Sequence, residues 1–440
     1  MSQLYAGFAE VDYTPELGLK LRGQQYTRIA ERVRDPLMAN AVAMRRGDEA
    51  VVIVSVDICF MPTQFVSEIQ RLFERRTGIS GDRLLIHATH SHAAPAAVAY
   101  YWAEPDPAFM EKLRDDILTA AASAVDRMEP AEAFSGAHQI DCLNWNRRSM
   151  FADGTSAMHG SADRPDFIGT EGFRDPNVSV LFFRNPSRKI LGVVPNFGTH
   201  PNCVDNECYY SADLVGEVRR LLKVMLDSHT VVVYLTGAAG NTTPVMREPG
   251  RKEQPWMGET GLLRAGMRLA GEIGSIIAEA VEPIADPILA VRHNHLRIPI
   301  RPFGNSGDRC YPSYWSDESK AYYQALEEDW PRRLREESPV EVRISVVRVG
   351  DTVICTNPAE LFSEFALAIR EAAQSRVTII SQLTDGYVGY IPTPTAFQRG
   401  GYETWPSGTS QLVPEAGDRI VEATASLLAE ISGMGSESRS

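Results

Sequence analysis

The sequence feature that most limits what this chain can fold into is a short apolar stretch that runs into three histidines. Residues 84–88 have the composition of a buried strand, and His87, His90 and His92 fall within six residues, before Pro95. If the strand pattern continues, alternation places His90 and His92 on the same side of the backbone, so two imidazoles face one point. The loop that follows would open at a strand end, where α/β proteins usually place their chemistry.

Two interpretations of this histidine cluster are open. Any one of the histidines alone is more typical of a surface residue or of a hydrogen-bonded structural residue. The three together favour a metal site, because imidazole is the commonest ligand of catalytic zinc. Asp57 ends the preceding strand. It could cap a helix, anchor a loop or support His90 from outside the ligand set.

Composition and charge exclude several classes of partner. The chain has 440 residues, of which 44% are hydrophobic and 23% charged, as in ordinary soluble globular proteins. Its net charge of -13 argues against nucleic acid or an anionic membrane surface as the main partner and leaves a cationic or neutral small molecule open. There is no secretion-signal pattern at the start, and no apolar run approaches the roughly 20 residues needed to span a bilayer. We therefore expect a cytoplasmic protein.

The cysteines do not form a disulfide pattern, because six of them are scattered over a long chain. Cys203 and Cys208 follow His200 closely enough to suggest thiolate ligands for a metal. Their spacing lacks the two-residue hook of zinc ribbons, which favours reduced, structural cysteines.

Alternating strand and helix patterns predict an α/β fold in a single domain, because no linker divides the chain. The strand at 50–59 is apolar on both faces, as a central strand covered by helices would be. Residues 131–175 show no periodicity and predict a long irregular segment, either functional or poorly ordered. The other expected strands are 5–14, 41–45, 178–183, 190–197, 231–235, 288–300, 341–349, 352–356 and 377–383, and the expected helices are 64–76, 107–128, 214–226, 261–281, 319–336, one that ends at 373, and 413–431.

A second apolar strand also ends in a Thr-His pair. Residues 190–197 lead into Gly198-Thr199-His200-Pro201, which repeats the arrangement at residue 90. Small residues at 236–244 would let the backbone approach another part of the structure closely, and they lack the Gly-Lys-Ser/Thr ending of a phosphate loop. His293 and His295 lie among exposed polar residues of a strand, so we interpret them as structural.

Five motifs in order resemble the catalytic domain of the neutral, non-lysosomal ceramidases, which are zinc-dependent amidohydrolases that cut the N-acyl bond of ceramide. The resemblance runs from about residue 5 to about residue 410. The motifs are Thr89-His90-Ser91-His92-Ala93-Ala94-Pro95, Phe197-Gly198-Thr199-His200-Pro201, Pro358-Ala359-Glu360, Tyr387-Val388-Gly389-Tyr390-Ile391-Pro392-Thr393 and Tyr402-Glu403.

The resemblance implies a role for each matching residue. Four residues would bind Zn²⁺: His90, His200, Glu360 and Tyr390. His92, Tyr402 and Arg147 would surround the scissile amide, and Thr243 stands where the family has a serine. This chain has Asn-Arg-Arg-Ser around Arg147 where the family has Asn-Arg-Ser-Pro, and Asn241 replaces a family aspartate.

The residue types also suit hydrolysis independently of the resemblance. Two neutral imidazoles, one carboxylate and a weak tyrosine ligand leave zinc cationic, so that it can lower the pKa of a water molecule and polarise a carbonyl. A nearby histidine outside the ligand set can shuttle a proton to the leaving amine. Hydrogen-bond donors such as Tyr402 and Arg147 can stabilise an oxyanion.

We therefore expect an α/β mixed-sheet domain at 1–432, without the family's C-terminal β-sandwich domain, and a disordered tail at 433–440. The predicted function is zinc-dependent hydrolysis of an amide in an N-acyl lipid or in a smaller N-acyl or lactam compound. An esterase or lactonase on a small metabolite, and a non-catalytic metal-binding protein, are the alternatives. The sequence does not define the oligomeric state.

Overall fold

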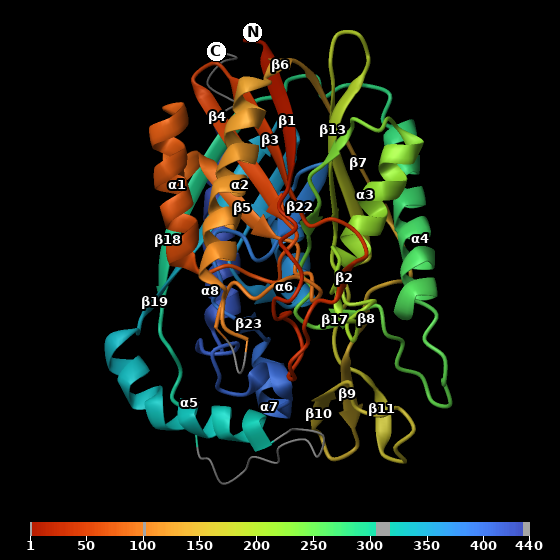
Figure 1. Ribbon diagram of the computed structural model, residues 1–440, viewed down its shortest axis with the longest axis vertical. Coiled ribbons are helices and arrows are strands. Elements are labelled where there is room, and N and C mark those ends of the chain that lie inside the picture. Colours follow the sequence, from red (N-terminus) through yellow and green to blue (C-terminus); the bar gives the residue numbers. More distant parts are fainter. Residues whose placement is uncertain (1, 100–102, 305–316, 434–440) are drawn as a thin grey trace.

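The strand that leads to the histidines lies at the edge of a five-stranded sheet in the computed structural model, which describes residues 2–99, 103–304 and 317–433. Its order is β5-β4-β3-β1-β6; β4 pairs in parallel with β5 and antiparallel with β3. Helices α1 and α2 pack on one face of this sheet (Figure 1). The bounds are β1 Leu4–Asp12, β3 Met38–Arg46, β4 Glu49–Val56, β5 Leu84–Ala88, β6 Glu129–Pro130, α1 Thr63–Thr77 and α2 Pro107–Asp126.

Two further sheets complete the framework. In the second, β13 pairs antiparallel with β12 and in parallel with β15 and β16, and helices α3 and α4 pack beside it. The third has the order β18-β19-β20-β22 and is covered by α6 and α8. The bounds are β7 Glu132–Gln139, β12 Asn177–Arg184, β13 Ile190–Phe197, β15 Val231–Val232, β16 Leu235–Thr236, α3 Asp213–Met225, α4 Gly258–Glu279, β18 Leu289–Ile298, β19 Val340–Val349, β20 Thr352–Thr356, β22 Val377–Ser381, α6 Ser363–Ala373 and α8 Ala416–Gly433.

One apolar cluster joins the three sheets. It contains Val42 and Ile53 from the first sheet, Leu181 from the second, and Val347 and Ile354 from the third, each no more than 2% exposed. Because both faces of the central strands are buried, their sequences are almost continuously apolar. The predicted α/β class is therefore confirmed as a mixed α/β fold.

Short elements gather toward the end of the molecule that lies away from the start of β1 (Figure 1). Among them, β8 pairs with β17, and β21 pairs with β23. The bounds of these and of the remaining elements are β2 Arg32–Val33, β8 Trp145–Asn146, β9 Arg148–Phe151, β10 Ser156–Met158, β11 Phe167–Thr170, β14 Tyr209–Tyr210, β17 Thr242–Thr243, α5 Asp317–Glu336, β21 Glu360–Leu361, β23 Tyr390–Ile391 and α7 Pro394–Arg399, with 3-10 turns at Gly81–Arg83 and Tyr402–Thr404.

The prediction of an irregular segment at 131–175 is wrong. The segment contains β7, which pairs with β12, and a three-stranded sheet of β9, β10 and β11. Glycines and polar residues hide the alternation of these strands. Strands β9, β10 and β11 are only three or four residues long, and β7 is completed by β12, which lies outside the segment. The expected strand at 231–235 is likewise split, into β15 and β16.

No helix among the described residues is both long enough and apolar enough to cross a bilayer. The predicted tail lies, apart from Gly433, outside the described residues.

Candidate metal centre

His90 is positioned by a turn, not by strand alternation. Strand β5 ends at Ala88, and His90 has a positive φ of 74°. Its backbone N–H donates to the carbonyl of Ile58, and its ring Nδ1 lies 2.9 Å from the carbonyl oxygen of Cys59. The predicted continuation of the strand through His90 and His92 is therefore wrong, because the chain leaves the sheet after Ala88, although the two rings do come close, with centroids 4.9 Å apart.

His87 is a structural histidine. Its Nδ1 lies 2.7 Å from the carbonyl oxygen of Gln382, and its Nε2 accepts the backbone N–H of Thr236 at 2.9 Å. Burial lowers its pKa to about 3, so the ring is neutral. The structural interpretation therefore holds for this member of the cluster.

His200 follows strand β13 and is held from behind by a carbonyl group. Its Nδ1 lies 2.6 Å from the carbonyl oxygen of Ala239, in the loop of small residues. Burial and the nearby Arg147 lower the pKa of His200 to about 3. The ring is therefore neutral, with its proton on Nδ1 and its Nε2 lone pair toward the centre.

Glu360 is placed by the pairing of two short parallel strands. In the register of β21 and β23, Glu360 lies opposite Tyr390. A Cβ on Gly240 would be only 2.4 Å from the carbonyl oxygen of Glu360, so the loop of small residues does approach another backbone closely, as predicted. The hydroxyl of Tyr387 donates to Glu360 Oε1 at 2.8 Å and leaves Oε2 for another partner.

Three atoms from these side chains converge. His90 Nε2 lies 3.2 Å from His200 Nε2 and 3.2 Å from Glu360 Oε2, and His200 Nε2 lies 3.4 Å from the same oxygen. Ligand atoms held at about 2.0–2.1 Å by a tetrahedral zinc ion lie roughly 3.3 Å apart. Glu360 Oε2 is buried and has no hydrogen-bond partner among the described residues. The set therefore fits a small divalent cation.

The charges at this centre also suit a cation. Burial disfavours charge on Glu360, yet His90 and His200 hold its pKa well below the usual value. Burial opposes protonation of His90, whereas Cys59 and Glu360 raise its pKa well above the usual value. Protons and a metal ion would therefore compete for His90.

Tyr390 and Tyr402 lie beside this centre, with ring centroids 5.7 Å apart. The guanidinium carbon of Arg147 is 5.3 Å from the ring centroid of Tyr390, and Arg147 Nη1 is 3.1 Å from His200 Nε2. Glu403 fixes Arg147 through a 2.9 Å ion pair with Nε. The structure thus brings these predicted residues to the histidines and the glutamate.

His92 lies close to the centre but has its own partner. Its ring centroid is 4.9 Å from that of His90, and its Nδ1 is 2.7 Å from Asp205 Oδ1. Burial disfavours the charged form of His92, but Asp205 outweighs this and raises its pKa to about 9. His92 is therefore a protonated residue beside the proposed ligands.

Thr243 is not among the residues that line the cavity at the centre. Thr243 lies on strand β17, and its hydroxyl is 3.4 Å from the side-chain oxygen of Asn202. This strand pairs with β8, directly before Arg147.

Cys59 is the thiol at this site, whereas Cys203 and Cys208 are not in either candidate metal group of the described residues. Its sulfur is 3.6 Å from His90 Nδ1, and it groups with His90 and His92. The five described cysteines are all free, in agreement with reduced thiols.

Asp57 anchors a loop and does not contact His90. Its carboxylate accepts the backbone N–H of Met38 and pairs with Arg219 at 2.8 Å. Of the interpretations left open, these contacts support the anchor, which ties the end of β4 to β3 and α3.

Several residues at the site have no role predicted from the sequence, although Tyr387 and Glu403 stand within the quoted motifs. Asp205, Tyr387 and Glu403 each contact a predicted residue, but only folding brings them together. The backbone after His200 is fixed by Asp213, whose carboxylate accepts N–H groups from Cys203 and Val204. Asp213, the first residue of α3, thus shapes the loop that carries Asp205.

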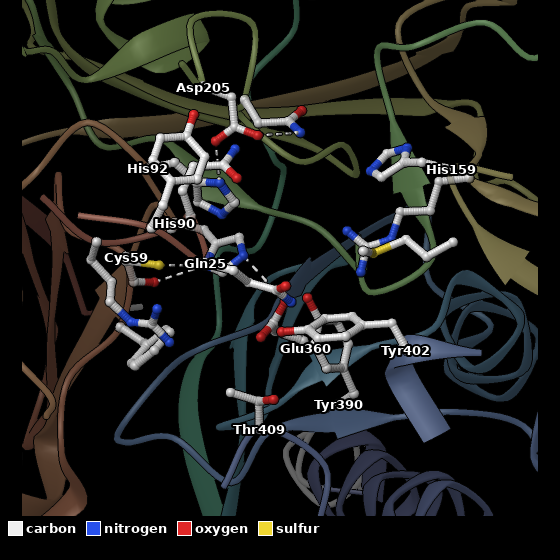
Figure 2. A pocket seen from close by; sticks show the side chains of 18 of the residues that line it. Gln25, Cys59, His90, His92, His159, Asp205, Glu360, Tyr390, Tyr402 and Thr409 are labelled. Atoms are coloured by element: carbon white, nitrogen blue, oxygen red, sulfur yellow. Dashed lines mark hydrogen bonds and ion pairs between the residues drawn. The ribbon is translucent and has the colours of Figure 1, made fainter. Parts of the chain in front are cut away.

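A cavity of about 370 Å³ opens onto this centre (Figure 2). Its lining is largely polar and aromatic, with charged side chains of both signs. The lining residues are Arg22, Gly23, Gln24, Gln25, Tyr26, Cys59, Phe60, His90, His92, Arg147, Met158, His159, Asn202, Asp205, Ser319, Glu360, Tyr387, Tyr390, Tyr402 and Thr409.

Comparison with known proteins supports the fold. No protein-family model matches the chain. The neutral ceramidase of Pseudomonas aeruginosa is 24% identical over 254 residues, which are 53% of this chain and 35% of that relative. The aligned stretch thus spans about a third of the curated relative.

Two solved structures resemble the whole chain. A crystal structure of neutral ceramidase from Pseudomonas aeruginosa has a TM-score of 0.77 at 17% identity, over 99% of this chain and 75% of that chain. A ceramidase complexed with C2 has the same TM-score at 16% identity, over 99% of this chain and 76% of that chain. The predicted structural resemblance is therefore confirmed.

Proposed function

Because the chain has a neutral ceramidase-like fold, we propose that it is a zinc-dependent hydrolase that cleaves the amide bond of small N-acyl compounds. The observation that carries this proposal is the convergence of His90, His200 and Glu360, whose facing atoms lie 3.2–3.4 Å apart. Tyr390 would complete the ligand set.

The chemistry of a bound zinc ion would be to activate water near neutral pH and to polarise the amide carbonyl. Glu360 keeps Oε2 for the ion because Tyr387 engages Oε1. The carbonyl groups of Cys59 and Ala239 hold the two imidazoles in the tautomer whose Nε2 is a ligand.

The residues around the ion would stabilise the oxyanion and protonate the leaving amine. Arg147, fixed by Glu403, and Tyr402 would donate hydrogen bonds to the oxyanion. His92, kept protonated by Asp205, would give its proton to the leaving amine.

The cavity favours a small substrate. A volume of about 370 Å³ lies at the low end of small-molecule pockets, which span roughly 300–1,000 Å³. Its lining is rich in charged and hydrogen-bonding groups, whereas the two alkyl chains of a ceramide would require a long apolar channel. This supports a polar N-acyl compound over ceramide.

Metal removal tests the proposal. The protein is stripped with a chelator, reloaded with Zn²⁺, and assayed on a set of amides and the matching esters of the same acyl groups. We expect activity to disappear on chelation and to return with zinc, with amides preferred. Hydrolysis that survives complete metal removal would refute the zinc mechanism, and a preference for esters would replace the amidase by an esterase.

A further inference from the structure

His159 enters the cavity from an element that the proposed mechanism does not use. It follows strand β10, lines the cavity, and has a positive φ of 55°, which is uncommon for a residue with a side chain. Its backbone N–H donates to the carbonyl of Arg147 at 2.9 Å. Figure 2 shows the ring across the cavity from His92 and Asp205. The strained backbone therefore presents an imidazole at the far wall.

Arg247 lies behind this imidazole and donates from Nη2 to His159 Nδ1. With Nδ1 as acceptor, the proton of the neutral ring is on Nε2. Burial, together with Arg247 and Arg147, lowers the pKa of His159 well below the usual value. The ring is therefore a neutral hydrogen-bond donor, polarised by a cation.

Arg247 has no carboxylate partner among the described residues, in contrast to Arg147 and Arg148. Arg147 is paired with Glu403, and Arg148 with Glu171 and Glu403. The Nε of Arg247 is also buried without an acceptor, and burial lowers the pKa of this guanidinium. A largely buried cation without compensation is costly unless a ligand supplies negative charge.

The acidic residues of the cavity cannot supply that compensation. Asp205 is paired with His92, and Glu360 belongs to the candidate metal centre. The wall that holds His159 therefore has a positive electrostatic character, although the chain as a whole carries a net charge of -13.

We propose that His159, backed by Arg247, binds a carboxylate on the acyl portion of the substrate, so that preferred substrates are monoamides of short dicarboxylic acids. The inference rests on the proposed amide hydrolysis. His92 serves the leaving amine on one side of the metal centre, so the acyl chain extends toward the opposite wall. There His159 Nε2–H would donate a charge-assisted hydrogen bond to the carboxylate.

The test compares three amides with the zinc-loaded full chain. N-succinyl-propylamine has the carboxylate on the acyl side, N-(4-oxopentanoyl)propylamine replaces one carboxylate oxygen by a methyl group, and N-butanoylglycine has the carboxylate on the amine side. We expect kcat/KM for the succinyl compound to exceed the other two by about tenfold or more, mostly through KM.

Single substitutions test whether the preference for the succinyl amide depends on His159 and Arg247. His159→Leu and Arg247→Met should each lower the ratio of kcat/KM between the succinyl and oxopentanoyl amides by about tenfold, whereas His159→Gln, which keeps an N–H donor, should retain part of it. Arg251→Met is the matched control, because Arg251 is paired with Glu248 near the same segment and does not line the cavity. Its ratio should equal that of the unmodified protein.

A binding measurement separates this inference from the proposed function. Calorimetry with the Glu360→Gln protein measures the Kd of the succinyl and oxopentanoyl amides without turnover. Tighter binding of the succinyl compound that is lost in His159→Leu/Glu360→Gln would support the anion site even if the unmodified protein hydrolyses neither amide. Equal hydrolysis of the two amides, a preference that survives both single variants, or a preference for N-butanoylglycine would overturn the inference and leave the hydrolase proposal intact.

Discussion

Two pairs of histidines in this molecule lie at similar ring distances in very different surroundings. The rings of His90 and His200 have centroids 4.7 Å apart, and those of His293 and His295, on strand β18, are 5.6 Å apart. The side chains of the first pair are 2% and 0% exposed, and those of the second are 31% and 44% exposed.

The partners of the two pairs differ as well. Each imidazole of the first pair has its Nδ1 on a backbone carbonyl and its Nε2 toward the same carboxylate oxygen of Glu360. In the second pair, His293 and His295 lie near separate carboxylates, Asp82 and Glu341. Closeness of two histidines therefore does not define a metal site. The features that indicate a metal site are burial of both rings, fixed tautomers, and a shared carboxylate oxygen, here Glu360 Oε2, without a hydrogen-bond partner among the described residues.

The largest expected effect comes from removing that shared carboxylate. Glu360→Gln keeps the size of the side chain but loses the negative charge, so zinc binding and hydrolysis should fall by about 10³-fold or more. The matched change on the surface pair, Glu341→Gln, should leave both unchanged. Zinc content per chain, kcat/KM and circular dichroism are measured for both proteins. Near-normal turnover in Glu360→Gln would eliminate the mechanism.

A substitution of Arg147 tests whether hydrolysis at the centre formed by His90 and His200 needs the neighbouring guanidinium. Arg147→Lys keeps the charge but loses the fixed fork that Glu403 holds, so kcat should fall by about 10²-fold while zinc content is kept. The readout is kcat together with bound zinc. A variant with normal kcat would show that Arg147 serves only to balance Glu403.

Tyr387 tests the support of the shared carboxylate. Tyr387→Phe removes the 2.8 Å hydrogen bond to Glu360 Oε1 and keeps the ring that stacks on Phe60. Loss of such a contact outside the ligand set typically weakens metal affinity by about 10- to 100-fold. Competition with a chelator measures the affinity, and an unchanged value would mean that the hydroxyl does not orient the ligand.

The smallest effect concerns a surface histidine and pH. Glu272 accepts a hydrogen bond from His138 Nδ1, and this contact raises the pKa of His138 above the usual value. The protonated pair therefore stabilises the fold at low pH, and this contribution is lost as pH rises through the folded-state pKa. His138→Gln should lower the free energy of unfolding by at most about 1 kcal/mol at pH 5.5 and by almost nothing at pH 9. Urea denaturation at both values checks the sign, and an equal loss at both would contradict it.

Much of the framework is predictable from sequence because its strands are long and apolar. The strands that form the hairpins of β3 with β4, β12 with β13 and β19 with β20 lie close to the expected ranges. The segment at 131–175 escapes prediction because β8 to β11 are only two to four residues long and are rich in polar residues, and because some of the pairing is with distant residues, as for Asn146 with Thr242.

The candidate site likewise contains residues that could be predicted from the sequence and residues that could not. Residues in motifs, such as His90, His200 and Glu360, can be identified before folding and do converge. A supporting partner outside the motifs, such as Asp205, lies on a loop whose path depends on contacts elsewhere, including the N–H groups that Asp213 binds. His90 shows the limit most clearly, because a positive φ brings its ring to the centre where strand alternation was expected.

The most direct test of the central claim is the zinc X-ray absorption spectrum and anomalous diffraction of the zinc-loaded protein. The account predicts one ion bound by nitrogen and oxygen atoms at about 2.0–2.1 Å, from His90, His200 and Glu360. A sulfur ligand at about 2.3 Å, which would point to Cys59, or an ion located at His293 and His295, would contradict it.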